Sequence, residues 1–128
     1  MTVISSLTQN VYAINGEVLT FPVTIASGES LSDAADFGSG KLVGIIIPGS
    51  WTTASLTFSA SADGTTFKDL YDDAVERAIP SGSVLADHFI ALDYRNWLMV
   101  KALKVRSGAA GVPVTQGADR VITLVAIN

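Results

Sequence analysis

The sequence predicts an all-β protein: an antiparallel β-sandwich, or a jelly-roll-like variant of one, with a short N-terminal arm. Several segments alternate apolar and polar residues with a period of two, and turns that contain Gly or Pro separate them. No long stretch shows the helical period of about 3.6 residues. The 128 residues fit one domain. We therefore expect an arm or edge strand over residues 1–16 and a single β-sandwich domain over residues 17–128.

The first predicted strand covers residues 17–26, where Leu19, Phe21, Val23 and Ile25 share one face. Pro22 has no N–H to donate to a neighbouring strand, so this strand should lie at a sheet edge. Residues 41–48 form a continuous apolar run, which is typical of a strand buried on both faces. The intervening residues are predicted to be a long connection, with at most one helical turn that begins at Ser32.

The second half of the chain continues the strand pattern. Residues 53–61 alternate small hydroxyl side chains with apolar ones, and an Asp63–Gly64 turn predicts a hairpin. Residues 93–99 could form one helical turn. Further strands are expected at residues 65–71, 87–93, 97–107 and 120–127.

Composition excludes several classes of function. The net charge is −4, from 8 basic and 12 acidic residues, and there is no basic cluster, so we expect no nucleic-acid partner. No apolar run approaches the roughly 18 residues of a membrane span, and no membrane contact is expected. Without cysteine there is no disulfide or thiolate site. Hydrophobic residues make up 48% and charged residues 16%, so part of the apolar surface is expected in a subunit interface.

The most acidic segment, residues 59–76, raises the question of a metal site or a catalytic pair. It contains Asp63, Asp69, Asp72, Asp73 and Glu76. The spacing of these acids does not fit an EF-hand. A calcium site remains an alternative if Asp72 and Asp73 lie in a turn that brings both carboxylates to one ion. Lys68 and Arg77 lie beside the acids, so a salt-bridged hairpin rim explains them better than a glycosidase pair.

The single histidine, His88, is expected to be a strand-edge side chain, because no nucleophile motif accompanies it. We therefore predict no enzymatic activity, no catalytic residue, no metal site and no cofactor.

A carbohydrate site is the alternative hypothesis. Trp51, Tyr94, Arg95 and Trp97 supply the aromatic and polar side chains that sugar-binding sandwiches use. The competing interpretation is that Trp51 and Trp97 close the two ends of the core, since Trp is highly buried on average. The two interpretations differ in whether both rings are exposed.

Two segments of the chain carry a recognisable pattern. The first is P-x-x-W-T-x-A-x-L-T-F followed by S-x-D-G-x-x-F-x-x-L-Y-D, and the second is L-K-x-R-S-G followed by P-V-x-Q-x-A-D-R. Over residues 28–127 the sequence thus resembles a group of small tailed-phage and prophage proteins. The S-x-D-G-x-x-F piece is also locally similar to discoidin-like, galactose-binding-like sandwiches.

The resemblance implies a virion structural protein, with a capsid decoration or cement subunit as the first expectation. The alternative is a glycan-binding module of a phage tail or fibre. The implied partners are the major capsid protein and copies of this chain, by analogy as a homotrimer. The implied location is the capsid surface of the virion, after synthesis in the host cytoplasm without an export signal. Apolar residues of the N-terminal arm are candidates for the interface: Val3, Ile4, Leu7, Val11 and Tyr12.

Overall fold

The computed structural model describes residues 16–128. Within this range it contains ten strands and two short 3-10 helices. The 3-10 helices are η1 (Ser81–Ser83) and η2 (Tyr94–Trp97). The strands are β1 (Val18–Ile25), β2 (Leu31–Asp36), β3 (Lys41–Ile46), β4 (Leu56–Ser61), β5 (Lys68–Asp69), β6 (Tyr71–Asp72), β7 (Val75–Glu76), β8 (Phe89–Ala91), β9 (Ala102–Ser107) and β10 (Arg120–Ile127).

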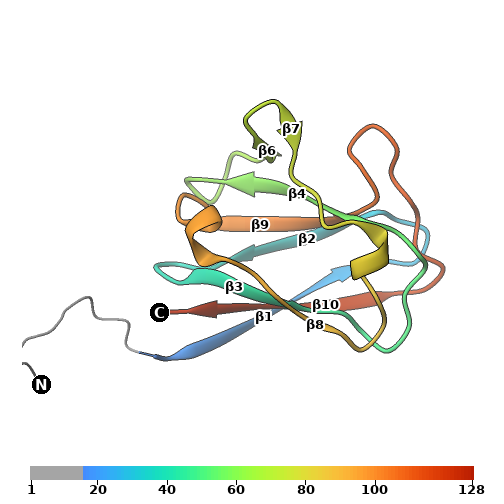
Figure 1. Cartoon of the computed structure of the whole chain (residues 1–128), viewed down its shortest axis with the longest axis horizontal. Coiled ribbons are helices and arrows are strands. Elements are labelled where there is room, and N and C mark those ends of the chain that lie inside the picture. The colour runs from blue at the N-terminus through green and yellow to red at the C-terminus, as the bar shows by residue number, and fades with distance from the viewer. Residues whose placement is uncertain (1–15) are drawn as a thin grey trace, which may run out of the picture.

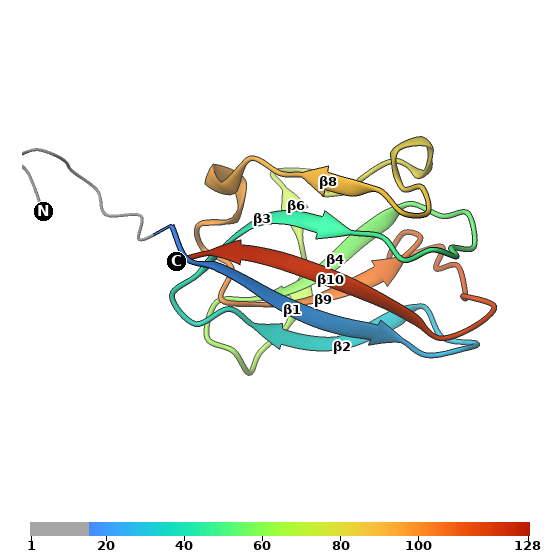
Figure 2. The same cartoon turned by 90° about the horizontal axis from the view of Figure 1, so that it is seen from below.

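The strands form two layers, and every pairing is antiparallel. Sheet A has the order β1-β10-β3-β8, sheet B has the order β2-β9-β4-β5, and β6 and β7 form a small separate ribbon. Figures 1 and 2 show the two layers from two directions. The predicted all-β antiparallel sandwich is confirmed.

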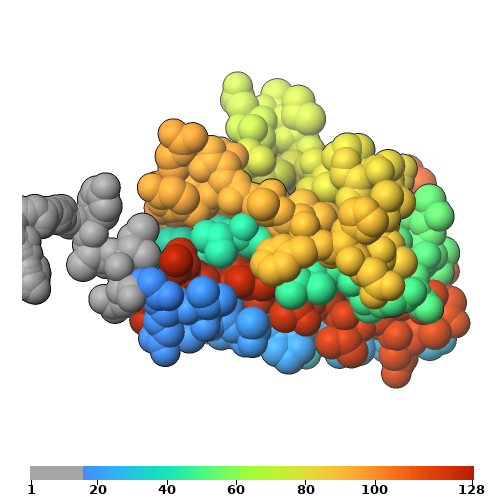
Figure 3. Space-filling model, turned by 60° about the horizontal axis from the view of Figure 1, so that its bottom comes forward, coloured from blue at the N-terminus to red at the C-terminus, as the bar shows by residue number. Residues whose placement is uncertain are grey.

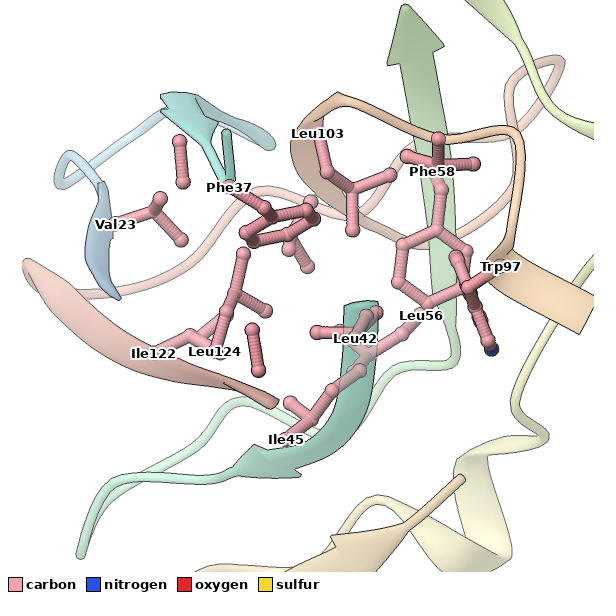
Figure 4. Close-up of a cluster of buried hydrophobic side chains, with 14 of the residues drawn as sticks. Val23, Phe37, Leu42, Ile45, Leu56, Phe58, Trp97, Leu103, Ile122 and Leu124 are labelled. Carbon is pink, nitrogen blue, oxygen red and sulfur yellow. The ribbon is translucent and has the colours of Figure 1, made fainter. Parts of the chain in front are cut away.

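The core lies between the two sheets, where each long strand contributes every second residue. Val23 and Ile122 face the core from sheet A, and Phe58 and Leu103 face it from sheet B (Figure 4). Trp97, at the end of η2, is 2% exposed and packs edge-on against Phe58 with the ring centroids 5.0 Å apart. Trp97 therefore closes one end of the core, as one of the two interpretations predicted.

Strand β1 is an edge strand of sheet A, as Pro22 predicted. Its backbone N–H groups alternate in direction, and that of Thr24 points away from β10 because it donates to Asp33 Oδ1 at 2.8 Å. Pro22 is two residues away and so belongs to the same outward-pointing set. At the free edge of β1, Pro22 therefore offers no N–H group, and the N–H group of Thr24 is already hydrogen-bonded to Asp33.

The connection predicted between residues 26 and 41 is wrong in part, because it contains β2. This strand is the edge of sheet B and pairs with β9, with a register shift between Leu31 and Ala34. Small and acidic residues have low strand propensity, which concealed it. Pairing with β9 and burial of Ser32 and Ala35 hold it in place.

Two other predicted boundaries also moved. The strand expected over residues 97–107 begins only at Ala102, since η2 occupies Tyr94–Trp97. The return strand expected over residues 65–71 is split between β5 and β6. The alternation of the later strand is correct: Leu103 and Val105 are buried, while Lys104 and Arg106 face outward.

The expected arm lies almost wholly outside the described residues. This applies to all five of its proposed interface residues: Val3, Ile4, Leu7, Val11 and Tyr12. Among residues 16–128, no helix is long and apolar enough to cross a membrane.

Replacing Trp97 should destabilise the fold strongly. Trp97→Ala removes the ring that packs against Phe58, and we expect a loss of about 3–5 kcal/mol in the free energy of unfolding. Urea denaturation followed by circular dichroism measures this. The control is Met99→Ala: Met99 is 67% exposed, and its loss should cost less than about 0.5 kcal/mol. Equal losses in the two variants would contradict the placement of Trp97.

Candidate functional site

The strand alternation that fills the core also defines two outer faces, and they differ in chemistry. The outer face of sheet A consists of the residues that point away from the core. They are Val18, Thr20, Pro22 and Thr24 on β1, Val121, Thr123, Val125 and Ile127 on β10, Lys41, Gly44 and Ile46 on β3, and Phe89 and Ala91 on β8. Lys41, opposite Ile127 at the start of β3, is the one ionisable side chain in this set. We call this set the sheet A outer face.

Much of this face is apolar and open. Val18 is 62% exposed, Phe89 63% and Val121 48%. The ring of Phe89 lies over Gly44, where a Cβ atom would come within 2.5 Å of Phe89 Cε1, so a larger residue would require the ring to move. Figure 3 shows the four strands side by side on this side of the molecule, in blue, red, teal and orange. The result is a broad surface of valine, threonine and aromatic side chains.

The charge on this face lies at one end. Lys41 is the first residue of β3, and its Nζ atom donates to the backbone oxygen of Leu98 at 3.0 Å, just beyond η2. The rest of the sheet A outer face carries no charged side chain.

The outer face of sheet B is charged, and its charges are paired. Arg106 on β9 donates from Nη2 to Asp69 Oδ1 at 2.7 Å and lies 3.5 Å from Glu76 Oε2 through Nη1. Glu76 also accepts the backbone N–H of Ala110 at 3.1 Å. Only 11% of the Arg106 side chain is exposed. One guanidinium thus bridges two carboxylates and holds both in fixed positions, and the group of three keeps a net charge of −1.

Two lysines on the sheet B side also make contacts with neighbouring side chains. Lys101 Nζ lies 2.7 Å from Asp36 Oδ2. This hydrogen-bonded lysine holds the pKa of Asp36 below its usual value. Lys104 Nζ lies 4.7 Å from the centre of the Phe67 ring, in a cation–π contact. The two outer faces thus contrast: sheet B carries several charges, most of them in ion pairs, and sheet A carries only Lys41, at one end.

The acidic segment forms a hairpin rim. Asp63 Oδ1 accepts the backbone N–H groups of Thr66 and Thr65, both at 2.9 Å, and the Ser61 hydroxyl at 2.9 Å. These hydrogen bonds, that from Thr66 first, hold the pKa of Asp63 well below its usual range. Gly64 has a φ of 91°, as the predicted Asp-Gly turn requires.

Asp69 and Glu76 do converge, but on Arg106 and not on Lys68 or Arg77 as their neighbours in sequence suggested. Arg77 instead pairs with Asp72 at 2.9 Å and lies over the Trp97 ring at 5.8 Å.

The four residues proposed for sugar binding do not form one surface. Trp97 is buried, and Tyr94 is 44% exposed on η2. Arg95 pairs with Asp93 at 2.7 Å; this guanidinium lowers the pKa of Asp93 to about 2, and Asp93 raises the pKa of Arg95. Trp51 is half-buried and donates to the Ala54 carbonyl at 3.4 Å. It follows the far end of β3, whereas η2 contacts the start of that strand.

A surface hollow of about 380 Å³ lies where residues 60–70 meet Met99 and Val100. Its acidic and basic lining comes from Asp63, Lys68 and Asp69. No aromatic residue lines it, so it lacks a platform on which a sugar ring could stack.

Within residues 16–128, no group of three or more histidine or acidic residues is placed to hold a metal ion. His88 is exposed, and its Nδ1 atom lies 2.9 Å from the backbone oxygen of Ala86. Asp73 adopts a positive φ of 59° in the turn between β6 and β7.

A buried polar network joins the loops at the other end of the sandwich. Gln116 is 1% exposed; its amide nitrogen donates to Thr52 O and Ser107 Oγ, and its Oε1 accepts from Thr52 N and Arg120 Nε. Nearby, Gly108 has a φ of 87°, and a Cβ there would lie 2.6 Å from Val114 N. These residues belong to the recognised sequence pattern, and their contacts give them a structural role.

No protein-family model matches this chain, and no curated protein matches its sequence. Among solved structures, the fold is similar to the crystal structure of the SPBc2 prophage-derived protein YomS. The TM-score is 0.54 at 13% identity, over 93% of this chain and 100% of that chain. At this identity the similarity establishes a shared fold. The neighbour is itself prophage-derived, which is consistent with the predicted resemblance to phage and prophage proteins. The local similarity to discoidin-like sandwiches stays a prediction.

Asp63 should contribute to the loss of stability in acid. Its pKa is lower in the folded than in the unfolded chain, so its stabilising effect is complete above about pH 4 and is lost as the pH falls further. In Asp63→Asn, the loss of stability below about pH 4 should be smaller than in the wild type. Thermal unfolding at a series of pH values measures this, with Asp73→Asn as the control. An unchanged pH dependence in Asp63→Asn would refute the role of the turn.

Proposed function

We propose that this chain is a non-enzymatic structural protein of a phage virion, a decoration or cement subunit of the head. Its partners are the major capsid protein and other copies of itself. The proposal rests on the contrast between the two outer faces: one carries charged side chains that mostly form ion pairs, and the other is largely uncharged, apolar and open. An exposed sheet face of valine, phenylalanine, proline and threonine is typical of a surface that another protein covers.

The shared fold with a prophage-derived protein supports the phage context. A decoration subunit acts by burial and hydrogen bonding between subunits, so it needs no catalytic group. The carboxylates of Asp69 and Glu76 suit this role, because their ion pairs with Arg106 hold the hairpin in place. The carbohydrate alternative gains no separate support, because Trp97 is buried and the surface hollow has no aromatic lining.

Binding to capsids should resist salt. The chain has a net charge of −4, and an attachment that depended on charge pairs would weaken as salt shortens the screening length from about 10 Å at 0.1 M to about 3 Å at 1 M. We expect the protein to pellet with capsids from a phage or prophage strain that lacks its gene, to a similar extent at both salt concentrations. Co-sedimentation with quantification of the pellet measures this.

Capsids of an unrelated phage are the control and should leave the protein in the supernatant. Mass spectrometry of purified wild-type virions provides a second, independent measurement, in which the chain should be present in many copies. Failure to pellet at low salt, together with absence from virions, would overturn the proposed function.

A further inference from the structure

We propose that the sheet A outer face packs against the same face of a second copy of this chain. The inference rests on the proposed function in taking this face as an assembly surface, and it deepens that function by naming the partner. The resulting contact is isologous, so it predicts a dimer where analogy with other virion proteins suggested a homotrimer.

The absence of charge over most of this face makes it compatible with its own copy. In an isologous contact each surface meets its own copy, so any unpaired charge near the axis would face a like charge. The outer face of sheet B would bring Arg106, Lys104 and Asp69 against their own copies. On the sheet A outer face the one charge, Lys41, lies at the end of β3, and the centre of the face consists of uncharged residues such as Thr123 and Pro22. Sheet A is therefore the face better suited to pair with itself.

The dimensions of the face indicate a small contact. Its four strands, β1, β10, β3 and β8, have 8, 8, 6 and 3 residues. At about 3.3 Å per residue along a strand and about 4.8 Å between strands, each residue covers about 16 Å². The footprint is then about 400 Å² per copy and about 800 Å² in total, which is at the low end for a protein–protein contact, so the dimer should form only at high concentration.

The edges of the sheet favour contact through the face. At the free edge of β1, Pro22 supplies no N–H, and the Thr24 N–H already donates to Asp33. A second copy therefore cannot extend the sheet by pairing with the whole of β1. Two sheet faces, in contrast, pack about 10 Å apart through interdigitating side chains, as the two sheets do inside each sandwich.

Other exposed apolar residues do not form a comparable surface. Val75 is 69% exposed on the β6–β7 ribbon, and Val112 is 72% exposed in the loop before β10. Each lies on a turn away from the paired strands of sheet A. They match Val18 and Phe89 in exposure, which makes them suitable control positions.

The test is self-association of the full-length protein in the absence of capsids. Light scattering after size exclusion should give twice the chain mass of 13.4 kDa at high concentration, and dilution should give the single mass. Val121→Lys and Thr20→Lys each place a lysine on both copies, so each should weaken dimerisation by about 100-fold or more. Both positions are exposed, and circular dichroism checks that each variant is folded.

Val112→Lys is the matched control, because it adds the same charge at an exposed valine outside the face. It should leave the dimerisation constant unchanged. Leu7→Lys tests whether residues 1–15, which also contain no charged side chain, are the occupant instead.

A single-chain mass at every concentration up to about 200 µM, far above the Kd of a typical specific interface, would overturn the inference. So would an association that Val121→Lys and Thr20→Lys do not weaken, or one that Leu7→Lys alone abolishes. A monomer that still pellets with capsids would refute the inference and leave the proposed function standing. A dimer that neither binds capsids nor occurs in virions would support the inference and refute the proposed function.

Discussion

Burial of the apolar core between two sheets is the constraint on which the rest of the structure depends. Each strand must direct alternate residues inward, as Leu124 and Val23 do from sheet A and Phe58 and Leu103 do from sheet B. The remaining residues are then fixed on the outside. The chemistry of each outer face follows from the same alternation that fills the core, so a single-residue shift in register would exchange core and surface. The largely uncharged face of sheet A and the charged face of sheet B are both consequences of this constraint.

A second set of contacts holds the loops to that framework. Gln116 is buried with all of its amide groups bonded, and it links the loop before β10 to the loop after β3. Thr57 adds a hydrogen bond of 2.6 Å to the Gly108 carbonyl. The two sequence patterns singled out above include these residues, and their positions give those patterns a role in loop geometry. A buried amide is costly unless it is fully paired, so such positions tolerate few substitutions.

Local patterns predicted the strands that bury apolar residues at regular spacing, such as β1, β3 and β10. They missed β2, because its small and acidic residues form a strand only through pairing with β9. Arg106 was missed as the partner of Asp69 and Glu76, because those residues lie 37 and 30 positions away in the sequence. The sequence showed only part of the largely uncharged surface: the alternation in β1 placed Leu19, Phe21, Val23 and Ile25 on one face and so left its valine, proline and threonines on the other. That β1 and β10 are neighbours is a property of the fold.

The most direct measurement of whether the sheet A outer face is covered by another molecule uses the absence of cysteine from this chain. A single cysteine can be placed on that face as Thr20→Cys, or on the outer face of sheet B as Ala34→Cys, and its rate of reaction with a maleimide followed as protein concentration rises. The structure predicts that Thr20→Cys becomes protected at high concentration while Ala34→Cys keeps a constant rate. Equal rates at both positions at every concentration would contradict an interface on sheet A.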